Sequence, residues 1–307
     1  RRGRRRGRLM NHAGDGGLYA ELIQNRSFEF KATEQPDWNN LSFWTLTPLG
    51  EAKGGMAVEQ AWPVHPNNPN YAVLELREPA GEGITMSNPG FQGISLRAGE
   101  RYDLSLFARQ LYFGKRWGPH EQGTLPLTVR LESPSGEVLA QTKFDIAHRQ
   151  WQRLSATFIA SRSEPQARLV LLATVPGGLA FDEVSLFPQN TFRGRPNGLR
   201  ADLAEAIADL KPRFIRFPGG CLVHGNGLGN MYRWKDTVGP IEQRRQQANL
   251  WGYHQTMGLG YFEYFQFAED IGAQPVPVVP AGVCCQNSDH QGGTGQRGLP
   301  LESMSDY

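Results

Sequence analysis

Few side chains in this sequence stand where chemistry is expected. Arg216 lies inside the apolar stretch 214–217, where its charge is costly unless the guanidinium meets carboxylates or hydroxyls. A Pro-Gly-Gly turn ends that stretch, and Cys221 and His224 follow it. Two interpretations of Arg216 stay open, since it could face a ligand or form one half of a structural ion pair.

Aromatic residues are concentrated in the polar loop 225–253. Exposed rings in such a loop favour the stacking of sugars, because the CH-rich face of a sugar packs on an aromatic ring. Packing of the loop onto the body of the protein accounts equally well for any one ring. The rings are Tyr232, Trp234, Trp251 and Tyr253.

Metal and nucleotide sites find little support. The histidines His12, His224 and His254 have no ligand spacing such as HExxH, so we expect neither a metal site nor a cofactor. The glycine-rich stretch 225–229 resembles a phosphate-binding loop, but it does not lead into a helix. We therefore reject a dinucleotide site.

The three cysteines do not have the spacing of a disulfide scaffold or a zinc site. Cys284 and Cys285 are adjacent and cannot bridge without strain, and Cys221 lies about 60 residues away. No CxxC pair occurs, so the sequence supports neither a zinc ribbon nor a disulfide scaffold. The redox compartment stays undecided.

Carboxylates are missing where a glycosidase needs them. The stretches 214–217 and 274–279 are both followed by many residues without Asp or Glu. Hydrolysis of a glycosidic bond takes two carboxylates, about 5–5.5 Å apart in retaining enzymes. The sequence offers no such pair, so we expect no catalytic residue within the chain.

The middle of the chain is predicted to be all-β. Short alternating stretches are separated by turn residues at intervals of roughly 8–12 residues, which is typical of a β-sandwich. The strands are expected at 71–76, 102–108, 125–131, 152–158, 168–172 and 179–187.

The remainder is predicted to be α/β. A helix over 199–210, a buried strand at 214–217, a helix over about 261–271 and a strand at 274–279 indicate a parallel βαβ unit. A short amphipathic helix is expected over 18–25, and the end of a strand at 9–10. The simplest organisation is one α/β domain that carries an inserted β-sandwich.

Charge argues against a general nucleic-acid binder. The chain of 307 residues has 32 Lys and Arg, but six of these are arginines among the first eight residues, leaving 26 against 30 Asp and Glu. An acidic body binds phosphate backbones poorly. The arginine run is a basic arm for RNA, a solvated tail, or sequence foreign to the fold. It lacks the apolar core of a signal peptide, and no apolar run of 18 residues occurs that would span a membrane.

Four blocks of sequence closely resemble the bacterial α-L-arabinofuranosidases of glycoside hydrolase family 51. They lie at 11–29, which begins Asn-His-Ala-Gly-Asp-Gly-Gly, at 213–221, which reads Arg-Phe-Ile-Arg-Phe-Pro-Gly-Gly-Cys, at 233–240, and at 249–263. The β segment resembles the galactose-binding-like, carbohydrate-binding sandwich that some members carry after the first barrel strand. That match is looser and rests on position and β pattern.

The resemblance implies a (β/α)8 TIM barrel, of which about three of eight strands are legible, with the sandwich inserted. It implies a retaining enzyme (EC 3.2.1.55) that removes terminal α-L-arabinofuranosyl units from plant polysaccharides and needs no cofactor or metal. In the family, Arg216 matches an arginine of the active-site floor, and Trp251 matches an aromatic residue beside the sugar. Cys221 stands where other branches place an Asn that binds a sugar hydroxyl.

The two glutamates of the family mechanism follow strands 4 and 7 and have no match here. We therefore expect an amino-terminal fragment that is inactive alone. Its parts are the barrel start at 1–31, with a disordered tail at 1–8, the sandwich at 32–187 and the further barrel units at 188–307. At the front, Arg8 and Leu9 replace the family's usual strand-1 motif.

The implied partner is an arabinose-containing polysaccharide or oligosaccharide, with no nucleic acid and no membrane. The oligomeric state and the location stay open, although a periplasmic or extracellular parent enzyme is favoured. The alternative function is non-catalytic carbohydrate binding by the sandwich. Its candidate residues are Trp44, Trp62, Trp117 and Trp151, and packing in the core is the competing interpretation for each.

Overall fold

The computed structural model describes residues 14–117, 122–285 and 298–306. These residues form two compact units. The β unit comprises Glu21–Phe30 and Trp38–Asn197. The α/β unit comprises Arg1–Ala20, Lys31–Asp37 and Gly198–Tyr307, as far as these ranges are described. The expected tail at 1–8, the strand end at 9–10 and His12 lie outside the described residues.

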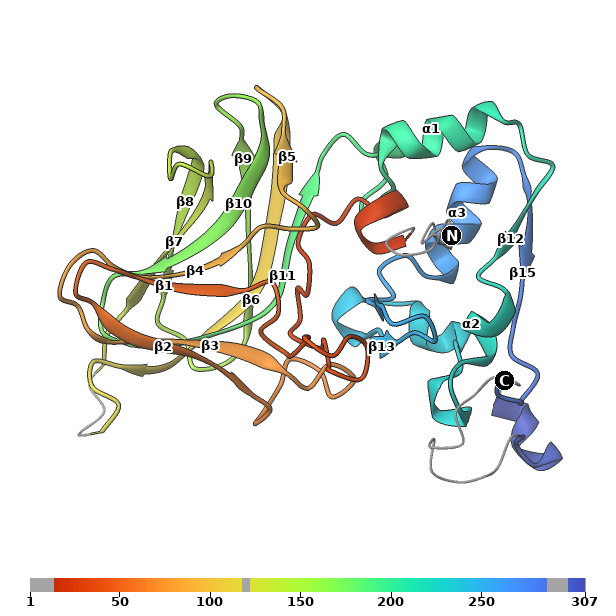
Figure 1. The fold of residues 1–307 in the computed structure, drawn as a ribbon, viewed down its shortest axis with the longest axis horizontal. Coiled ribbons are helices and arrows are strands. Elements are labelled where there is room, and N and C mark those ends of the chain that lie inside the picture. The colour runs from red at the N-terminus through yellow and green to blue at the C-terminus, as the bar shows by residue number, and fades with distance from the viewer. Residues whose placement is uncertain (1–13, 118–121, 286–297, 307) are drawn as a thin grey trace, which may run out of the picture. The chain divides into compact units, whose positions relative to one another are not determined.

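The β unit consists of two antiparallel sheets, which Figure 1 shows as two layers of arrows. One sheet has the order β1-β4-β10-β7-β8, with β5 also paired to β10, and the other has the order β2-β3-β11-β6-β9. The first comprises β1 (Thr45–Leu49), β4 (Gly83–Asn88), β10 (Glu164–Ala173), β7 (Leu125–Glu132), β8 (Val138–Ile146) and β5 (Ile94–Leu96). The second comprises β2 (Lys53–Glu59), β3 (Tyr71–Glu78), β11 (Gly177–Pro188), β6 (Arg101–Phe113) and β9 (Gln152–Ile159).

Alternation along the strands builds the core between these sheets. Leu74 and Leu76 on β3, and Leu104 and Leu106 on β6, are fully buried within one cluster, while the residues between them are more exposed or face the other side. Each buried side chain of this kind stabilises the fold by roughly 1.5–3 kcal/mol relative to exposure. The six strands expected from the sequence are all present, which confirms the β-rich prediction.

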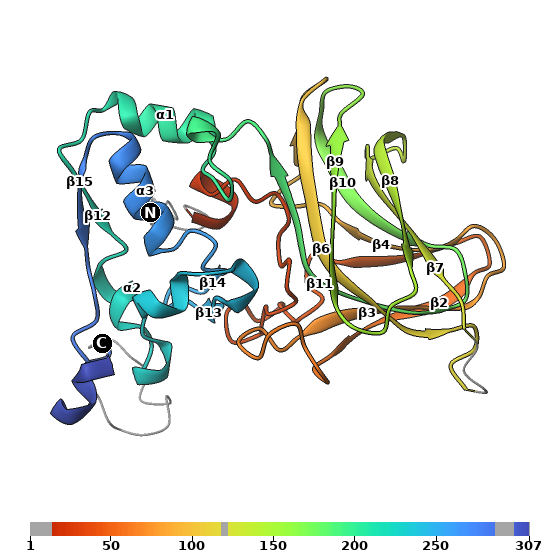
Figure 2. The ribbon, with the colours of Figure 1, turned by 180° about the vertical axis from the view of Figure 1, so that it is seen from behind.

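The α/β unit contains a two-stranded parallel sheet, seen from both sides in Figures 1 and 2. Strand β12 (Phe214–Phe217) pairs in register with β15 (Gln274–Pro277), and α3 (Tyr261–Asp270) lies between them in sequence. The expected helices at 199–210 and 261–271 are α1 (Ala201–Asp209) and α3. The described part of this unit also contains η1 (Gly14–Leu18), α2 (Gly220–His224), β13 (Gln247–Ala248) and β14 (His254–Gln255). Its short 3₁₀ helices are η3 (Leu228–Asn230), η4 (Trp234–Thr237), η5 (Ile241–Gln243) and η7 (Leu301–Asp306), and η2 (Phe192–Gly194) lies in the β unit.

Aromatic packing supports the parallel sheet. Phe217, at the end of β12, is 2% exposed and stacks on Tyr264 of α3 at a centroid distance of 4.7 Å. Tyr232 and Tyr261 complete the same buried cluster. The helix α3 is therefore fixed against the carboxyl end of β12, which leads directly into the Pro-Gly-Gly turn.

The expected helix over 18–25 was wrong. Tyr19 forms a bridge with Leu199, and the Leu22 N–H donates to the Leu186 carbonyl at 3.0 Å. Asn25 and Phe28 adopt left-handed backbone angles, which a right-handed helix excludes. Tertiary hydrogen bonds thus replace those that a helix would make.

The units are divided differently from the expected boundaries at 31/32 and 187/188. Glu21–Phe30 belongs to the β unit, because Ile23 and Phe28 are buried in the core between its sheets. The short segment Lys31–Asp37 returns to the α/β unit, and 188–197 stays with the β unit. The chain therefore passes between the units more often than a single insertion requires.

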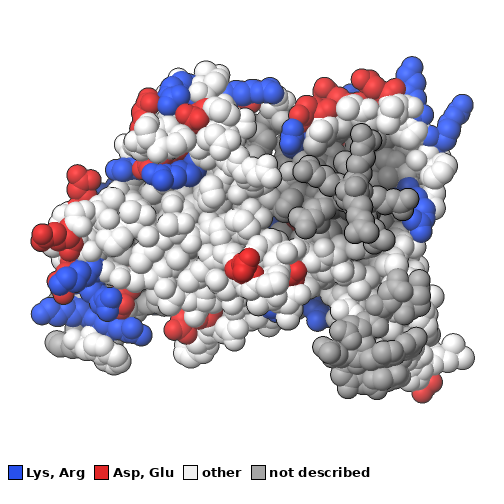
Figure 3. All heavy atoms as spheres, viewed as in Figure 1, with Lys and Arg blue, Asp and Glu red and all other residues white. Residues whose placement is uncertain are grey.

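The face of the β unit seen in Figure 3 carries no continuous basic surface; its charged side chains of both signs lie mainly toward the margins. Within the described ranges, none of the helices has the length and apolar character needed to cross a bilayer. The expectation about nucleic acid stays a prediction.

Candidate functional site

The α/β unit contains a cavity of about 210 Å³. Its walls come from the turn at Gly14, the chain after β12, the loop 251–259 and the helix α3. The residues that line it are Gly14, Asp15, Pro218, Gly219, Leu222, Tyr232, Trp251, Tyr253, His254, Gln255, Met257, Leu259 and Tyr264.

Aromatic rings form much of this wall. Trp251 and Tyr253 lie nearly parallel, with centroids 6.4 Å apart and planes at 17°, and Trp251 is 42% exposed. Burial raises the pKa of the phenols of Tyr232, Tyr253 and Tyr264, so these groups stay neutral near pH 7. Flat rings and neutral hydroxyls suit an uncharged ligand that has both CH faces and hydroxyl groups.

Asp15 is the one carboxylate among the lining residues. It accepts the backbone N–H of Thr256 at 3.0 Å and also the Thr256 hydroxyl. These bonds fix the turn that contains Gly14 against the loop 251–259. A second carboxylate, which hydrolysis of a glycosidic bond requires, is not among the described residues that line the cavity.

A buried contact holds the aromatic loop in place. His254 Nδ1 lies 2.5 Å from Glu34 Oε1, and His254 Nε2 lies 2.9 Å from Gln246 Oε1. The Glu34 and His254 side chains are 1% and 2% exposed. Next to Glu34, the Gln35 amide donates to the Gly252 carbonyl. The segment Lys31–Asp37 thus positions Trp251 and Tyr253 on either side of Gly252.

We expect Glu34→Gln to loosen this loop at a cost of about 1.5–3 kcal/mol, because one glutamine oxygen cannot replace both carboxylate oxygens, which contact His254 and the Lys31 N–H. Hydrogen exchange of peptides covering 246–255 should become faster, and the unfolding midpoint of the chain should fall. The exposed Glu51→Gln serves as the control. Equal exchange in both variants would show that Glu34 does not hold the loop.

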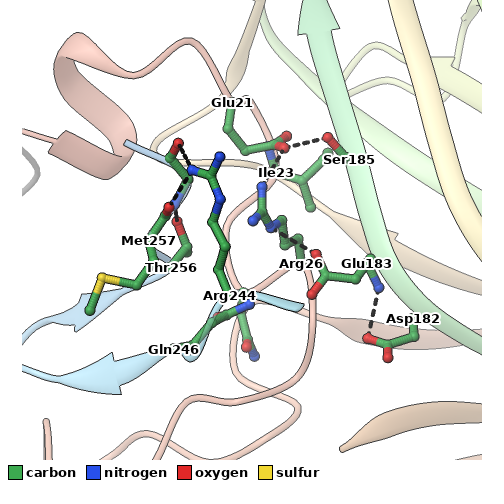
Figure 4. Close-up of polar contacts among 12 residues, drawn as sticks. Glu21, Ile23, Arg26, Asp182, Glu183, Ser185, Arg244, Gln246, Thr256 and Met257 are labelled. Carbon is green, nitrogen blue, oxygen red and sulfur yellow. Dashed lines mark hydrogen bonds and ion pairs between the residues drawn. The ribbon is translucent and has the colours of Figure 1, made fainter. Parts of the chain in front are cut away.

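A second buried group shapes the wall, as Figure 4 shows for Arg244 and Met257. Arg244 is 4% exposed and donates to the carbonyls of Met257 and Gly258 at 2.9 and 3.0 Å. It also donates two bonds to the Glu263 carboxylate, at 2.9 and 2.8 Å, and its Nε–H donates to the Gly239 carbonyl at 3.1 Å. Glu263 in turn accepts the Gly260 N–H at the start of α3.

One of the three predicted site residues lines the cavity, and the other two lie outside its wall. Trp251 lines the cavity, whereas Arg216 and Cys221 do not. Arg216 is exposed on β12, and its guanidinium lies against Gly219, where φ is +79°. Cys221 lies on α2 immediately before Leu222, a lining residue.

Only some of the predicted loop aromatic residues and histidines line the cavity. Tyr232, Trp251 and Tyr253 line the cavity, and Trp234 does not. His254 lines it, whereas His224 contacts the Val283 carbonyl at 2.7 Å. Across the described part of the chain, no three His, Cys, Asp or Glu side chains are grouped as a metal ion requires.

Sequence reasoning missed Asp15, Glu34, Arg244 and Glu263. For Glu263 a signal existed, because a Glu three residues after the N-cap residue, here Gly260, is typical of a capping position. Nothing local marks Arg244, which follows an ordinary polar loop and precedes another arginine.

Comparison with known proteins identifies relatives. A family model described as "Alpha-L-arabinofuranosidase 1 domain" matches residues 206–302. An extracellular exo-α-L-arabinofuranosidase of Streptomyces chartreusis is 42% identical over 91% of the chain and 32% of its own length. Alpha-L-arabinofuranosidase 1 of Arabidopsis thaliana is 36% identical over 89% of the chain and 39% of its own length.

A solved structure agrees with these relatives. The arabinose-bound MgGH51 α-L-arabinofuranosidase superposes with a TM-score of 0.80 at 34% identity, covering 97% of this chain and 45% of that one. The chain therefore spans less than half the length of the relatives it matches. Sequence and fold together show that the chain is similar to one part of an α-L-arabinofuranosidase.

Proposed function

We propose that this chain is part of an enzyme that releases terminal α-L-arabinofuranosyl units from plant polysaccharides, and that the cavity is part of its sugar site. The observation that carries the proposal is the cavity wall of stacked Trp251 and Tyr253 with buried, neutral tyrosines. A furanosyl unit presents both CH groups and hydroxyls, which match such a wall. The relatives' names support the same reaction class.

The proposal extends to a (β/α)8 barrel to which β12 and β15 contribute neighbouring strands. In such barrels the chemistry lies at the carboxyl ends of the strands. The turn after Phe217 supports this, because Pro218 and Gly219 line the cavity. Within this barrel Arg216 supports the floor through its contact with Gly219, and Cys221 and Trp251 contact the sugar.

A retaining mechanism with two glutamates is proposed for the whole enzyme, and neither glutamate belongs to this chain. The single lining carboxylate, Asp15, supports this division, because Thr256 already occupies both of its oxygens. A chain that holds part of the sugar site without an acid pair should bind sugar and leave the bond intact.

The 307-residue chain is expected to show no turnover of 4-nitrophenyl α-L-arabinofuranoside above background. Titration with L-arabinose should change tryptophan fluorescence, and Trp251→Ala should weaken binding at least about tenfold, which equals about 1.4 kcal/mol. The control is Trp234→Ala, an exposed ring of the same unit that does not line the cavity. Turnover by the chain contradicts the missing acid pair, and binding that survives Trp251→Ala contradicts the sugar site.

Binding of polysaccharide by the β unit is a second candidate function. Trp62 and Trp117 are 80% and 84% exposed, which is unusual for rings of this size. Trp151 is half-buried, donates its indole N–H to the Trp62 carbonyl at 2.8 Å and lies under the Arg109 guanidinium. Trp44 is 5% exposed and belongs to the core, so it is no longer a candidate.

Titration of the full chain with arabinoxylan tests this second function. The double variant Trp62→Ala/Trp117→Ala should lose most of the polymer affinity, while Trp251→Ala keeps it. The full chain is used because the segment 32–187 lacks Ile23 and Phe28 of the core. If Trp251→Ala loses the polymer affinity and the double variant keeps it, the polymer binds at the cavity. If the unmodified chain and both variants bind equally well, neither the exposed tryptophans nor the cavity binds the polymer.

A further inference from the structure

Two cysteines that are far apart in the sequence meet in the α/β unit. The side chains of Cys221 and Cys285 are in hydrogen-bond contact, and neither residue belongs to a disulfide. This bond raises the pKa of the Cys221 thiol, because its proton is shared with the neighbouring sulfur. No local pattern pairs these residues, because Cys285 is 64 positions from Cys221.

The backbone around the two sulfurs is tied together independently of them. The Cys285 N–H donates to the Gly225 carbonyl at 3.3 Å, and His224 Nδ1 lies 2.7 Å from the Val283 carbonyl oxygen. The Gly225 N–H donates to the Cys221 carbonyl at 2.9 Å, which closes α2. Helix α2 and the segment 283–285 are therefore held side by side, and the contact of the thiols follows from that arrangement.

The cysteines differ in accessibility. Cys221 is partly exposed, while Cys285 and Cys284 are 2% and 9% exposed. A small reagent therefore reaches Cys221 first, and Cys285 lies behind it. In position Cys221 is therefore the attacking thiol and Cys285 the resolving thiol, and because the pKa of Cys221 is raised, its attack requires an alkaline buffer that deprotonates it.

We propose that Cys221 and Cys285 form a reversible dithiol/disulfide pair that reacts with small disulfides such as oxidised glutathione. The Cys221 thiolate attacks one sulfur of the reagent, forms a mixed disulfide and releases one glutathione thiolate. Cys285 then gives up its proton and attacks Sγ of Cys221, which forms the protein disulfide and releases the second glutathione. Two protein thiols are oxidised, the reagent is reduced to two thiols, and the two protons go to the released thiolates.

Formation of the Cys221–Cys285 disulfide links α2 covalently to the segment that follows β15. Because Leu222 follows Cys221 and lines the cavity, the link fixes one wall of that cavity. It also removes the Cys221 thiol from any contact with a ligand. The inference stands on the thiols alone and does not depend on the proposed glycosidase function.

The test treats the full chain with oxidised glutathione in mildly alkaline buffer, alkylates residual thiols and digests with trypsin. Cleavage at Arg216, Arg233, Arg245 and Arg297 places Cys221 in peptide 217–233 and the other two cysteines in peptide 246–297. We expect these peptides to be linked, with a mass two hydrogens below their sum, and the link to disappear on reduction. Fragmentation of the linked peptides should assign the bond to Cys285 without any variant.

Three variants sharpen the result. Cys221→Ser and Cys285→Ser should each abolish the link, and the matched control Cys284→Ser should retain it. A link that persists in Cys285→Ser and disappears in Cys284→Ser overturns the assignment. A stable glutathione adduct on Cys221 beside a reduced Cys285 in the unmodified sequence overturns the proposal, as does an internal Cys284–Cys285 bond.

Discussion

Replacing Arg244 by alanine is expected to lower the free energy of unfolding of the α/β unit by about 3–5 kcal/mol. The substitution leaves the Glu263 carboxylate buried without its cation, at 5% exposure. It also removes the donors of the Met257 and Gly258 carbonyls. A charged group stranded in the interior costs more than the ion pair contributed, because its hydration is not restored.

The effect should be localised at the cavity. Hydrogen exchange is expected to accelerate in peptides covering 257–264, which carry Met257, Leu259 and Tyr264 of the wall. Exchange rates in Arg244→Lys should lie between those of the unmodified chain and those of Arg244→Ala, since an ammonium cannot bind both Glu263 oxygens and two carbonyls in one plane. Exchange is the preferred measurement because a chain of two units need not unfold in a single transition.

Arg245→Ala is the matched control, since the neighbouring arginine is exposed. Its unfolding midpoint and exchange rates should equal those of the unmodified chain. If the two alanine variants behave alike, the five bonds of Arg244 do not stabilise the wall, and the cavity depends on aromatic packing alone.

Local periodicity explains why much of the fold was predictable. The alternation in β3 and β6 and the helical spacing of α1 are properties of neighbouring residues, so they can be recognised without tertiary information. The wrong prediction of a helix over 18–25 also comes from relying on local spacing. Leu18, Leu22 and Ile23 have helical spacing, but the backbone there bonds to Leu186 and Leu199 instead.

The candidate site was predictable only in its aromatic part. Trp251 and Tyr253 were recognised because exposed rings in a polar loop are unusual by composition. The polar groups that hold them come from far along the chain: Glu34 is 220 positions from His254, and Asp15 is 241 positions from Thr256. No spacing rule connects such pairs, so they required the structure.

The β unit has a buried charge cluster whose centre is Arg26, shown in Figure 4 beside Glu183. Arg26 is 1% exposed and forms ion pairs with Glu183 at 3.1 Å and Glu21 at 3.4 Å. Asp182 is 0% exposed, with one oxygen accepting the Glu183 N–H at 2.7 Å. A bulge in β11 between Asp182 and Ser185 turns Glu183 toward Arg26, and the Val184 N–H donates to the Arg26 carbonyl.

Arg26→Met, which keeps an unbranched apolar side chain, is expected to destabilise the β unit by about 3–5 kcal/mol near neutral pH. Two carboxylates then lose their buried cation, and burial alone cannot hold them ionised. Arg162→Met is the comparison, since Arg162 lies closer to its partner Glu137, at 2.9 Å, but is 43% exposed. Arg162→Met should lower the free energy of unfolding much less than Arg26→Met does, because solvent screens an exposed ion pair.

The cost of Arg26→Met should shrink toward acid pH. Burial raises the pKa of Glu21 in the folded chain, and Arg26 opposes that rise, so its removal raises the pKa of Glu21 further. A carboxyl whose folded pKa is raised contributes stability below its ordinary pKa and loses it as the pH rises through the folded value. As the pH rises above about 4.5, the ordinary pKa of a glutamate, the variant should therefore lose stability more steeply than the unmodified chain. Urea unfolding of both proteins across that range measures the difference, and a constant difference at every pH means that Glu21 does not gain a proton when Arg26 is absent.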